Sequence, residues 1–346
     1  MLMNCYQEDI QMVLAEFPLP WEKLSGKNIL VLGATGLIGG CLVDMLLLNP
    51  GIDYHVYAAG RNVERANKRF AAYASSHFYH FQPFDVTSPL QTDTDFDYIV
   101  DAAGGASPQL YVSDPVGVMK ANFMGVDNLL RFGLKHGLQK MVYVSSGEVY
   151  GEGDGRTFDE DYSGYVNPMT VRACYPSAKR AAETLCVCYA QQYGVDVSVA
   201  RPCHVYGPYF TEGDNRVYAQ FIRNVLAGED IVLKSKGEAF RSWTYVVDCA
   251  MALLHILLKG ESTQAYNIAN EESNVSIRRL AECVAEQTGR KVVFDIPQDA
   301  QQGSTTPITK AIFSTRKIEN LGWKPRFLLA DGIKHTISAL ATAPAR

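Results

Sequence analysis

Short apolar runs rich in β-branched and aromatic residues alternate along the chain with longer stretches of helical periodicity. Near-continuous hydrophobicity in such short runs predicts strands that are buried on both faces of a parallel sheet. The predicted strands are 28–32, 54–58, 78–84, 98–102, 140–145 and 195–201, and the main predicted helices between them are 37–48, 116–136 and 177–193. Alternation of this kind is typical of a doubly wound α/β fold.

A glycine-rich turn joins the first predicted strand to the first predicted helix. Glycines allow a tight turn and a close approach of the backbone to a pyrophosphate, which binds to the free N–H groups at a helix N-terminus. The turn therefore predicts a dinucleotide site of the Rossmann type. Its expected cofactor contacts are Gly33, Thr35, Gly36, Leu37, Ile38 and Gly39.

The end of the second predicted strand leaves both NAD and NADP open as cofactors. An acidic residue at this place would bind the adenosine ribose hydroxyls of NAD, but the segment Val56-Tyr-Ala-Ala-Gly60-Arg61-Asn62 contains none. Arg61 can bind the 2′-phosphate of NADP, stack on adenine or remain solvated. Asp85, after the third predicted strand, is placed either to bond the adenine amino group or to cap a turn.

Two further regions flank this dinucleotide-binding part. Before the first strand, a short amphipathic helix is predicted from Ile10, Val13, Leu14 and Phe17. After Arg201 the alternation breaks into Pro- and Gly-containing segments, and Ser276 is a suitable N-cap for a further helix. We therefore expect an N-terminal helical extension (1–25), a Rossmann domain (26–201, with about 241–270) and a smaller, mostly C-terminal α/β substrate-binding lobe (202–240 and 271–346).

Composition excludes several classes of protein. The chain has 346 residues, of which 47% are hydrophobic and 20% charged, as in ordinary globular proteins. A net charge of -5, from 32 basic and 37 acidic residues, gives no electrostatic footprint for nucleic acid or an anionic membrane. The eight cysteines are scattered and form no Cys-x-x-Cys pair, which predicts reduced thiols and no metal site. With no basic signal segment and no long apolar run, we expect a cytoplasmic protein.

Four residues form a candidate catalytic set. Tyr175 and Lys179 stand four apart at the start of a predicted helix and so share one face. The ammonium of Lys179 and a cationic nicotinamide would together lower the pKa of Tyr175 from about 10. Tyr175 could then accept a hydroxyl proton while hydride leaves the same carbon, with Ser146 holding the oxygen. Glu148, two residues beyond Ser146 at a strand end, is expected to point to the same side.

Taken together, these motifs resemble the extended short-chain dehydrogenase/reductase family, which includes nucleotide-sugar epimerases, dehydratases and decarboxylases. The likeness covers about residues 26–332. Its motifs are the glycine turn, Asp85, Lys120-Ala-Asn122, Ser145-Ser146, the Tyr175/Lys179 pair and the segments 201–208, 241–248 and 321–325. The resemblance implies that Tyr175 and Lys179 also bind the cofactor, together with Val86, Ala102, Ala103, Asn122, Ser145 and Pro202.

Within the family, the chain is most similar to the UDP-glucuronate decarboxylases, in the segments 106–111, 146–151 and 167–175. This resemblance implies contacts with a nucleotide sugar by Ser107, Tyr111, Arg172, His204 and Arg241. Arg172 would approach the sugar or a carboxylate, or else tie down its loop. Arg241 would clamp a diphosphate or form a surface salt bridge. His204 would touch the substrate or pack within its loop.

The chain departs from the family pattern in four places. Gly147-Glu148 stands where dehydratases have Asp-Glu, His204 where relatives have Asn, and Thr306-Pro307 where they have Arg-Pro, and the second-strand acid is missing. Without an acid at position 147, dehydration lacks its proton donor. We therefore expect oxidation at C4 of a uronic acid followed by decarboxylation. The alternatives are a 4-epimerase, an NADPH-dependent 4-keto-sugar reductase and, more remotely, a non-catalytic dinucleotide-binding protein.

The two long helices predict self-association. Residues 116–136 and 177–193 are apolar over more of their circumference than one contact with a sheet requires. Members of the resembled family commonly pair these helices into a four-helix bundle. We therefore expect a homodimer.

Overall fold

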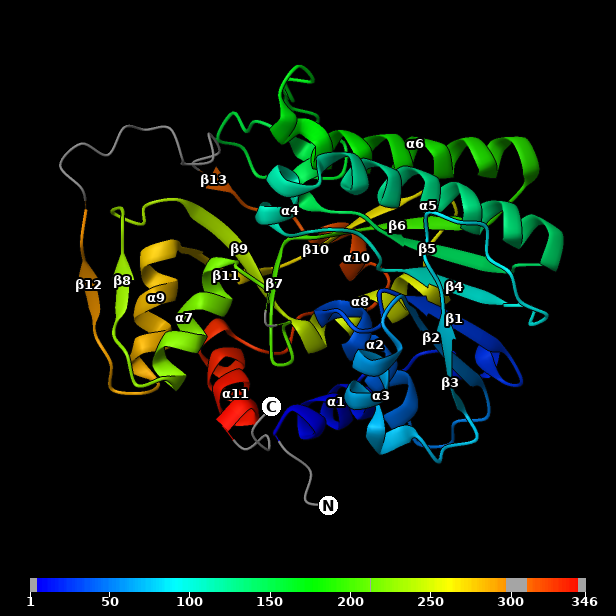
Figure 1. Cartoon of the computed structure of the whole chain (residues 1–346), viewed down its shortest axis with the longest axis horizontal. Helices are drawn as coiled ribbons and strands as arrows, with labels where there is room; N and C mark the ends of the chain where they lie inside the picture. The colour runs from blue at the N-terminus through cyan, green and yellow to red at the C-terminus, as the bar shows by residue number, and fades with distance from the viewer. Residues whose placement is uncertain (1–4, 212, 297–309, 342–346) are drawn as a thin grey trace.

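Within residues 5–211, 213–296 and 310–341, which the computed structural model describes, seven parallel strands form a central sheet with helices on both faces (Figure 1). The strand order is β10-β6-β5-β4-β1-β2-β3. The strands are β1 (Asn28–Leu32), β2 (His55–Gly60), β3 (Tyr79–Pro83), β4 (Tyr98–Asp101), β5 (Lys140–Val144), β6 (Val197–Pro202) and β10 (Ala265–Ile268). This arrangement confirms the predicted doubly wound α/β fold.

The strands β1, β4, β5 and β6 are largely buried on both faces as expected, and β10 at one edge is mostly buried too, but β3 at the other edge is not. In β1, Ile29 and Val31 pack into the core on one side of the sheet and Leu30 and Leu32 into the core on the other, because successive side chains alternate. None of the residues of β3 is buried. The expectation of burial on both faces is wrong for this strand, since it pairs only with β2 at the edge.

Helices cover each face of the sheet. On one face lie α2 (Leu37–Leu48) and α8 (Val246–Lys259), with α1 (Cys5–Glu16) packed against them; the predicted N-terminal helix is thus confirmed. On the other face lie α5 (Pro115–His136) and α6 (Cys174–Tyr193), side by side along their length (Figure 1). The shorter elements around the central sheet are α3 (Val63–Arg69), α4 (Pro108–Ser113) and the 3₁₀ turns η1 (Trp21–Leu24), η2 (Ala71–Tyr73), η3 (Gly147–Tyr150) and η4 (Val171–Ala173).

A second group of elements lies beside the carboxyl ends of the central strands, at the left of Figure 1. Its sheets contain β7 (His204–Tyr206), β9 (Phe240–Tyr245), β11 (Asn270–Ser276) and β13 (Lys310–Ala311), and separately β8 (Ile231–Leu233) and β12 (Val292–Phe294). Its helices are α7 (Val217–Leu226), α9 (Ile277–Glu286) and α11 (Leu329–Ala341), whereas the short helix α10 (Arg316–Glu319) packs against β10 and α8 of the central part. Ser276 caps α9 as predicted, because its hydroxyl accepts a hydrogen bond from the backbone N–H of Arg279.

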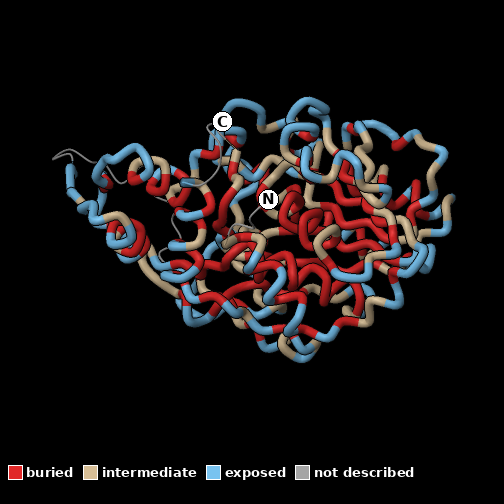
Figure 2. Tube along the Cα trace, turned by 90° about the horizontal axis from the view of Figure 1, so that it is seen from below, coloured by how far each residue is buried: buried red, intermediate tan, exposed pale blue. Residues whose placement is uncertain are grey.

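The buried residues follow the central sheet and its flanking helices, while outer loops and helix faces are exposed (Figure 2). Helix α8 is buried from Val246 to Leu258, between the sheet and α1. Among the helices in the described ranges, none combines the length and hydrophobicity that a bilayer crossing requires. The core therefore fixes the carboxyl ends of β1, β4, β5 and β6 relative to one another.

Candidate active site

The glycine turn after β1 contains two glycines in tight contact with the backbone and a third that borders open space. Gly33 has a φ of +66°, and a Cβ built on it would lie 2.5 Å from the carbonyl oxygen of Ala102. A Cβ on Gly39 would lie 2.5 Å from the carbonyl oxygen of Gly33. A Cβ on Gly36 would meet only that same oxygen, at 3.1 Å. Gly36 is the N-cap of α2 and offers no side chain to its first N–H groups, which suits a pyrophosphate.

Replacing Gly36 with valine should remove most of the affinity for the dinucleotide while the protein stays folded. The backbone of Gly36 is extended, so valine can adopt it, but its branched side chain would fill the space beside the helix N-terminus. The matched control is Gly39→Ala, which should lower the melting temperature because its Cβ meets the backbone of Gly33. Cofactor titration and thermal unfolding check both; wild-type affinity in Gly36→Val would contradict the assignment.

Unpartnered polar atoms lie near the carboxyl ends of the central strands. The buried Oδ1 of Asn122 and the buried Oγ of Ser145 have no hydrogen-bond partner among the described residues. A Cβ on Gly104, whose φ is +152°, would lie 2.9 Å from Asn122 Oδ1 and 3.5 Å from Nζ of Lys179. Buried polar atoms normally have partners, so the unpartnered atoms of Asn122 and Ser145 fit a bound dinucleotide, and the contacts of Asn122, Ser145 and Lys179 with it stay predictions.

The other predicted cofactor residues surround this region. Ala102 and Ala103 follow β4, and the N–H of Ala103 donates to the carboxylate of Asp101 at 3.0 Å. Pro202 is the buried last residue of β6. The carbonyl oxygen of Val86 accepts a hydrogen bond from the Asn128 side chain at 2.8 Å, which ties the loop after β3 to α5.

Arg61 and Asp85 lie at the predicted adenosine end of this site. Both are exposed. Oδ1 of Asp85 accepts hydrogen bonds from the N–H and the hydroxyl of Thr87, at 3.0 and 2.8 Å, and these bonds lower the pKa of Asp85, with a smaller contribution from Arg61. Asp85 therefore caps a turn, as one of the two alternatives predicted, and its contact with adenine stays a prediction.

The first turns of α6 bring Tyr175 and Lys179 together, both buried. The Nζ of Lys179 donates to the carbonyl oxygen of Val144 at 2.7 Å and lies 5.8 Å from the ring centre of Tyr175. Burial lowers the pKa of Lys179 to about 8, while the charge of Asp101 acts in the opposite direction. Lys179 is therefore anchored to the carboxyl end of β5 beside the phenol.

Burial raises the pKa of Tyr175, and the charge of Glu148 adds to the increase. A hydrogen bond with Ser146 and the charges of nearby arginines act in the opposite direction. In the protein alone the balance raises the pKa of Tyr175, because removing the phenolate from water costs more than these contacts recover. The predicted lowering by the ammonium of Lys179 and a cationic nicotinamide together stays a prediction.

Glu148 lies in a different type of local structure from the one expected. Ser146 and Glu148 do not alternate along a strand; Glu148 lies in the 3₁₀ turn η3, and Oγ of Ser146 accepts a hydrogen bond from its N–H at 3.2 Å. The expectation that both point to one side of a strand is therefore wrong. The carboxylate of Glu148 accepts two hydrogen bonds from Nη2 of Arg172, at 2.9 and 2.8 Å.

Aromatic stacking connects Arg172 to Tyr175. The guanidinium of Arg172 lies 4.8 Å from the ring centre of Tyr111, and the Tyr111 ring stacks on Tyr175 with centres 4.8 Å apart and an angle of 21°. Tyr111 comes from α4 and Arg172 from η4, so three separate segments converge here. The structure therefore brings together Tyr111, Arg172, Glu148 and Tyr175, as the sequence resemblance implied.

His204 and Arg241 approach the same region from β7 and β9. The ring of His204 lies 5.1 Å from that of Trp243, and His204 is exposed at the start of β7; partial removal from water and the charges of Arg241 and Arg216 lower its pKa. Arg241 is only 6% exposed, so the alternative of a surface salt bridge is wrong. Burial lowers the pKa of Arg241, and the charge of Glu148 acts in the opposite direction. Thr306 and Pro307 lie outside the described residues.

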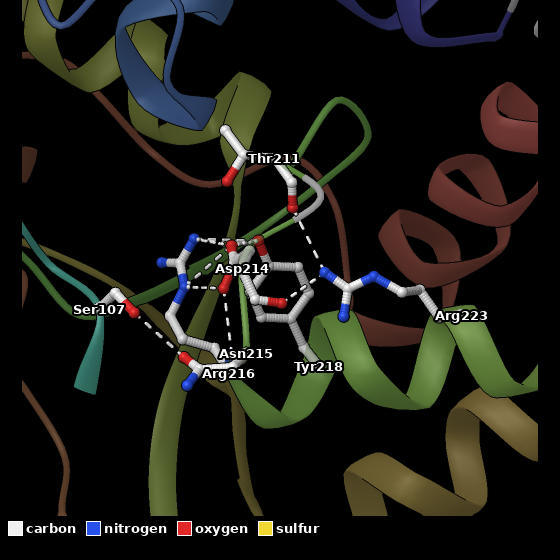
Figure 3. Close-up of polar contacts among 7 residues, drawn as sticks. All are labelled: Ser107, Thr211, Asp214, Asn215, Arg216, Tyr218 and Arg223. Carbon is white, nitrogen blue, oxygen red and sulfur yellow. Dashed lines mark hydrogen bonds and ion pairs between the residues drawn. The ribbon is translucent and has the colours of Figure 1, made fainter. Parts of the chain in front are cut away.

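Arg216 is a cation of this region that the sequence analysis missed. Together with Tyr218 it surrounds the carboxylate of Asp214, which accepts hydrogen bonds from Nε of Arg216 at 2.9 and 3.1 Å and from the hydroxyl of Tyr218 at 3.0 Å (Figure 3). Asn215 of the same loop accepts, at its Oδ1, a hydrogen bond of 3.1 Å from the hydroxyl of Ser107, the N-cap of α4 (Figure 3).

The charge of Arg216 acts to lower the pKa values of Tyr175 and Tyr111, which burial raises. The available sequence signal was the polar loop Gly213-Asp214-Asn215-Arg216 immediately before a strongly amphipathic helix. Only the fold shows that this loop lies beside α4 and near the start of α6.

Comparison with known proteins gives consistent results. The sequence profile of the NAD dependent epimerase/dehydratase family matches residues 29–269. The chain is 34% identical over 313 residues to UDP-glucuronic acid decarboxylase 6 of Arabidopsis thaliana, covering 89% of this chain and 87% of that protein.

Two solved structures have a similar fold. UDP-glucose 4-epimerase from Thermotoga maritima, solved with UDP-glucose, has a TM-score of 0.74 at 26% identity and covers 90% of this chain and 98% of the other. UDP-glucuronic acid 4-epimerase from Bacillus cereus, in complex with UDP-glucuronic acid and NAD, has a TM-score of 0.75 at 22% identity, with coverage of 90% and 98%. The second likeness concerns the fold alone.

Proposed function

Because the chain belongs to the NAD dependent epimerase/dehydratase family, we propose that it oxidises C4 of UDP-glucuronate, or of a close uronic acid relative, and decarboxylates the 4-keto product. It is an NAD-dependent enzyme of nucleotide sugars. The observation that carries the proposal is the stack from Tyr175 through Tyr111 to Arg172, which puts a cation beside the phenol. A sugar carboxylate is the substrate group that suits this cation.

In the first step Tyr175 accepts the proton of the C4 hydroxyl, and Ser146 holds the same oxygen by a hydrogen bond. Lys179, fixed on the carbonyl oxygen of Val144, places its ammonium near the phenol. NAD, when bound, supplies an acceptor for the C4 hydride and returns that hydride at the end of the cycle. The oxidation thus turns the C4 alcohol into a ketone, with the proton on Tyr175.

The C4 ketone makes the bond between C5 and C6 labile. The bond between C5 and C6 breaks, C6 leaves as carbon dioxide, and the bonding pair moves toward the C4 oxygen; C5 then takes a proton from water, which restores the C4 ketone. Tyr175 returns its proton to the C4 oxygen as the ketone is reduced again. Gly147 supports this outcome over dehydration: it carries no acid to protonate a leaving hydroxyl, and a Cβ at that position would collide with the ring of Phe313.

The direct test is incubation of the protein with UDP-glucuronate, in separate reactions with NAD and with NADP. We expect release of carbon dioxide with NAD and a product lighter by one carbon dioxide. A product of unchanged mass with a new configuration at C4 would indicate the 4-epimerase instead. No turnover of any uronate would reject both. UDP-glucose, which has no carboxylate, serves as the control substrate. Activity with NADP alone would assign Arg61 to a 2′-phosphate.

We further propose a homodimer formed by the helices α5 and α6. The exposed face of α5 carries large apolar side chains one and two turns apart: Val116, Met119 and Phe123, which are 62%, 46% and 43% exposed. An apolar stripe of this kind on a helix that already packs against the sheet fits a second copy of the chain. We also propose a cytoplasmic location; all eight cysteines lie in the described part of the chain and none is in a disulfide.

Placing a charge in this stripe should separate the subunits. Phe123→Asp is expected to give monomers at micromolar concentration, because a carboxylate buried in an apolar interface is strongly unfavourable. Leu226→Asp is the matched control, since Leu226 is equally exposed, at 41%, but lies on α7. Sedimentation of wild type and both variants decides the question. A monomeric wild type, or a dimeric Phe123→Asp variant, would contradict the proposed interface.

A further inference from the structure

Arg172 uses only one of its nitrogens on Glu148. Both hydrogen bonds to the carboxylate come from Nη2, and no residue that the structure describes accepts from Nε or Nη1. The side chain of Arg172 is 48% exposed and that of Glu148 34% exposed. A guanidinium carries five donors in a planar fork that matches a carboxylate. The ion pair with Glu148 therefore leaves one edge of the fork available.

The orientation of this edge is fixed on both sides. The ring of Tyr111 lies under the guanidinium, and Tyr111 in turn stacks on Tyr175. Glu148 is held by its backbone, because its N–H donates to Oγ of Ser146. Glu148 of the proposed catalytic set thus pairs directly with the arginine, Tyr175 lies one ring beyond it, and the two contacts together set the plane of the guanidinium.

Resting on the proposed function, we propose that Arg172 is the residue that selects a carboxylate-bearing sugar. Its edge formed by Nε and Nη1 binds the C6 carboxylate, while Nη2 keeps Glu148 in place. A neutral hexose has no group for this edge and leaves it solvated. Selection is then a difference in affinity between two otherwise similar sugars.

The charges near Glu148 explain why the arginine is needed. Without Arg172, the carboxylate of Glu148 would repel that of the substrate. Arg241 also interacts electrostatically with Glu148, but Arg241 is buried and comes from a different element, β9. With Arg172 between them, the two carboxylates share one guanidinium. A lysine at position 172 would supply the charge but not the planar fork.

The test measures binding without turnover, in a Tyr175→Phe background with NAD added. Calorimetry with UDP-glucuronate and UDP-glucose should show a preference of about tenfold or more for the uronate, the size expected for one bidentate charged contact. Adding Arg172→Gln should bring both affinities to within about twofold by weakening only the uronate. Arg172→Lys should fall between. The matched control Arg156→Gln, an exposed arginine paired with Asp154, should keep the full preference.

A second variant excludes a mere loss of local order. Glu148→Gln removes the repelling carboxylate and retains Arg172, so it should keep or increase the preference for the uronate. Loss of preference in Glu148→Gln, its persistence in Arg172→Gln, or its absence in the parent would overturn the assignment of Arg172. Binding is measured in a variant expected to turn over at least about two orders of magnitude more slowly. An error in the proposed reaction would therefore appear in the carbon dioxide assay, and an error in the role of Arg172 would appear in the binding assay.

Discussion

Tyr175→Phe is expected to fold, to bind both ligands and to lose at least about two orders of magnitude in kcat, because it removes only the proton acceptor. The buried ring still stacks on Tyr111 and belongs to the small apolar cluster that also contains Val118. A loss of this size corresponds to about 2.7 kcal/mol in the activation free energy. Steady-state rates, together with titration of NAD and of the nucleotide sugar, check the prediction.

The matched control for this variant is Tyr79→Phe. Tyr79 lies on the edge strand β3, and its buried hydroxyl has no partner among the described residues. Removing such a hydroxyl should leave the rate within about twofold and the stability almost unchanged. Near-wild-type turnover in Tyr175→Phe would mean that another group accepts the proton.

Lys179→Met should lose activity to a similar degree and should also bind NAD more weakly. The resemblance assigns Lys179 to the cofactor, and Nζ lies near the unpartnered amide oxygen of Asn122 around Gly104. Because the pKa of Lys179 is lowered to about 8, its ammonium is present at neutral pH and is lost as the pH rises through that value. NAD affinity of the wild type should therefore fall above about pH 8, whereas that of Lys179→Met should not follow this change.

A second buried lysine provides the control for burial itself. Lys140, at the start of β5, is 6% exposed and pairs with Asp196 at 3.2 Å. Lys140→Met should lower the melting temperature and leave kcat and NAD affinity unchanged. Equal losses of activity in the two methionine variants would mean that Lys179 acts only through stability.

The sequence predicts local structure well wherever short-range physics decides it. The range 28–32 matches β1 and the range 37–48 matches α2, because continuous hydrophobicity and the glycine turn are encoded within a few residues. The pairing of Tyr175 with Lys179 is likewise a property of one helix. The position of β3 is also close to its prediction, but its exposure depends on its place at the sheet edge, which no local pattern contains.

The parts of the site that were missed depend on contacts between distant segments. Glu148 lies in the 3₁₀ turn η3, whose N-cap is Ser146. The alternation of side chains expected along a strand does not indicate such a turn. Arg216 approaches Tyr175 only because a loop 41 residues further along the chain folds back beside α4. The burial of Arg241 and the collision at Gly147 with Phe313 are also long-range effects.

The central claim, oxidation at C4 before decarboxylation, is tested most directly by rapid mixing of the NAD-loaded protein with UDP-glucuronate while absorbance and carbon dioxide are followed together. We predict that the near-ultraviolet absorbance of reduced nicotinamide rises before carbon dioxide is released and then decays as product forms, and that Tyr175→Phe suppresses both signals. Release of carbon dioxide with no preceding reduced nicotinamide, or unchanged progress in Tyr175→Phe, would contradict the account.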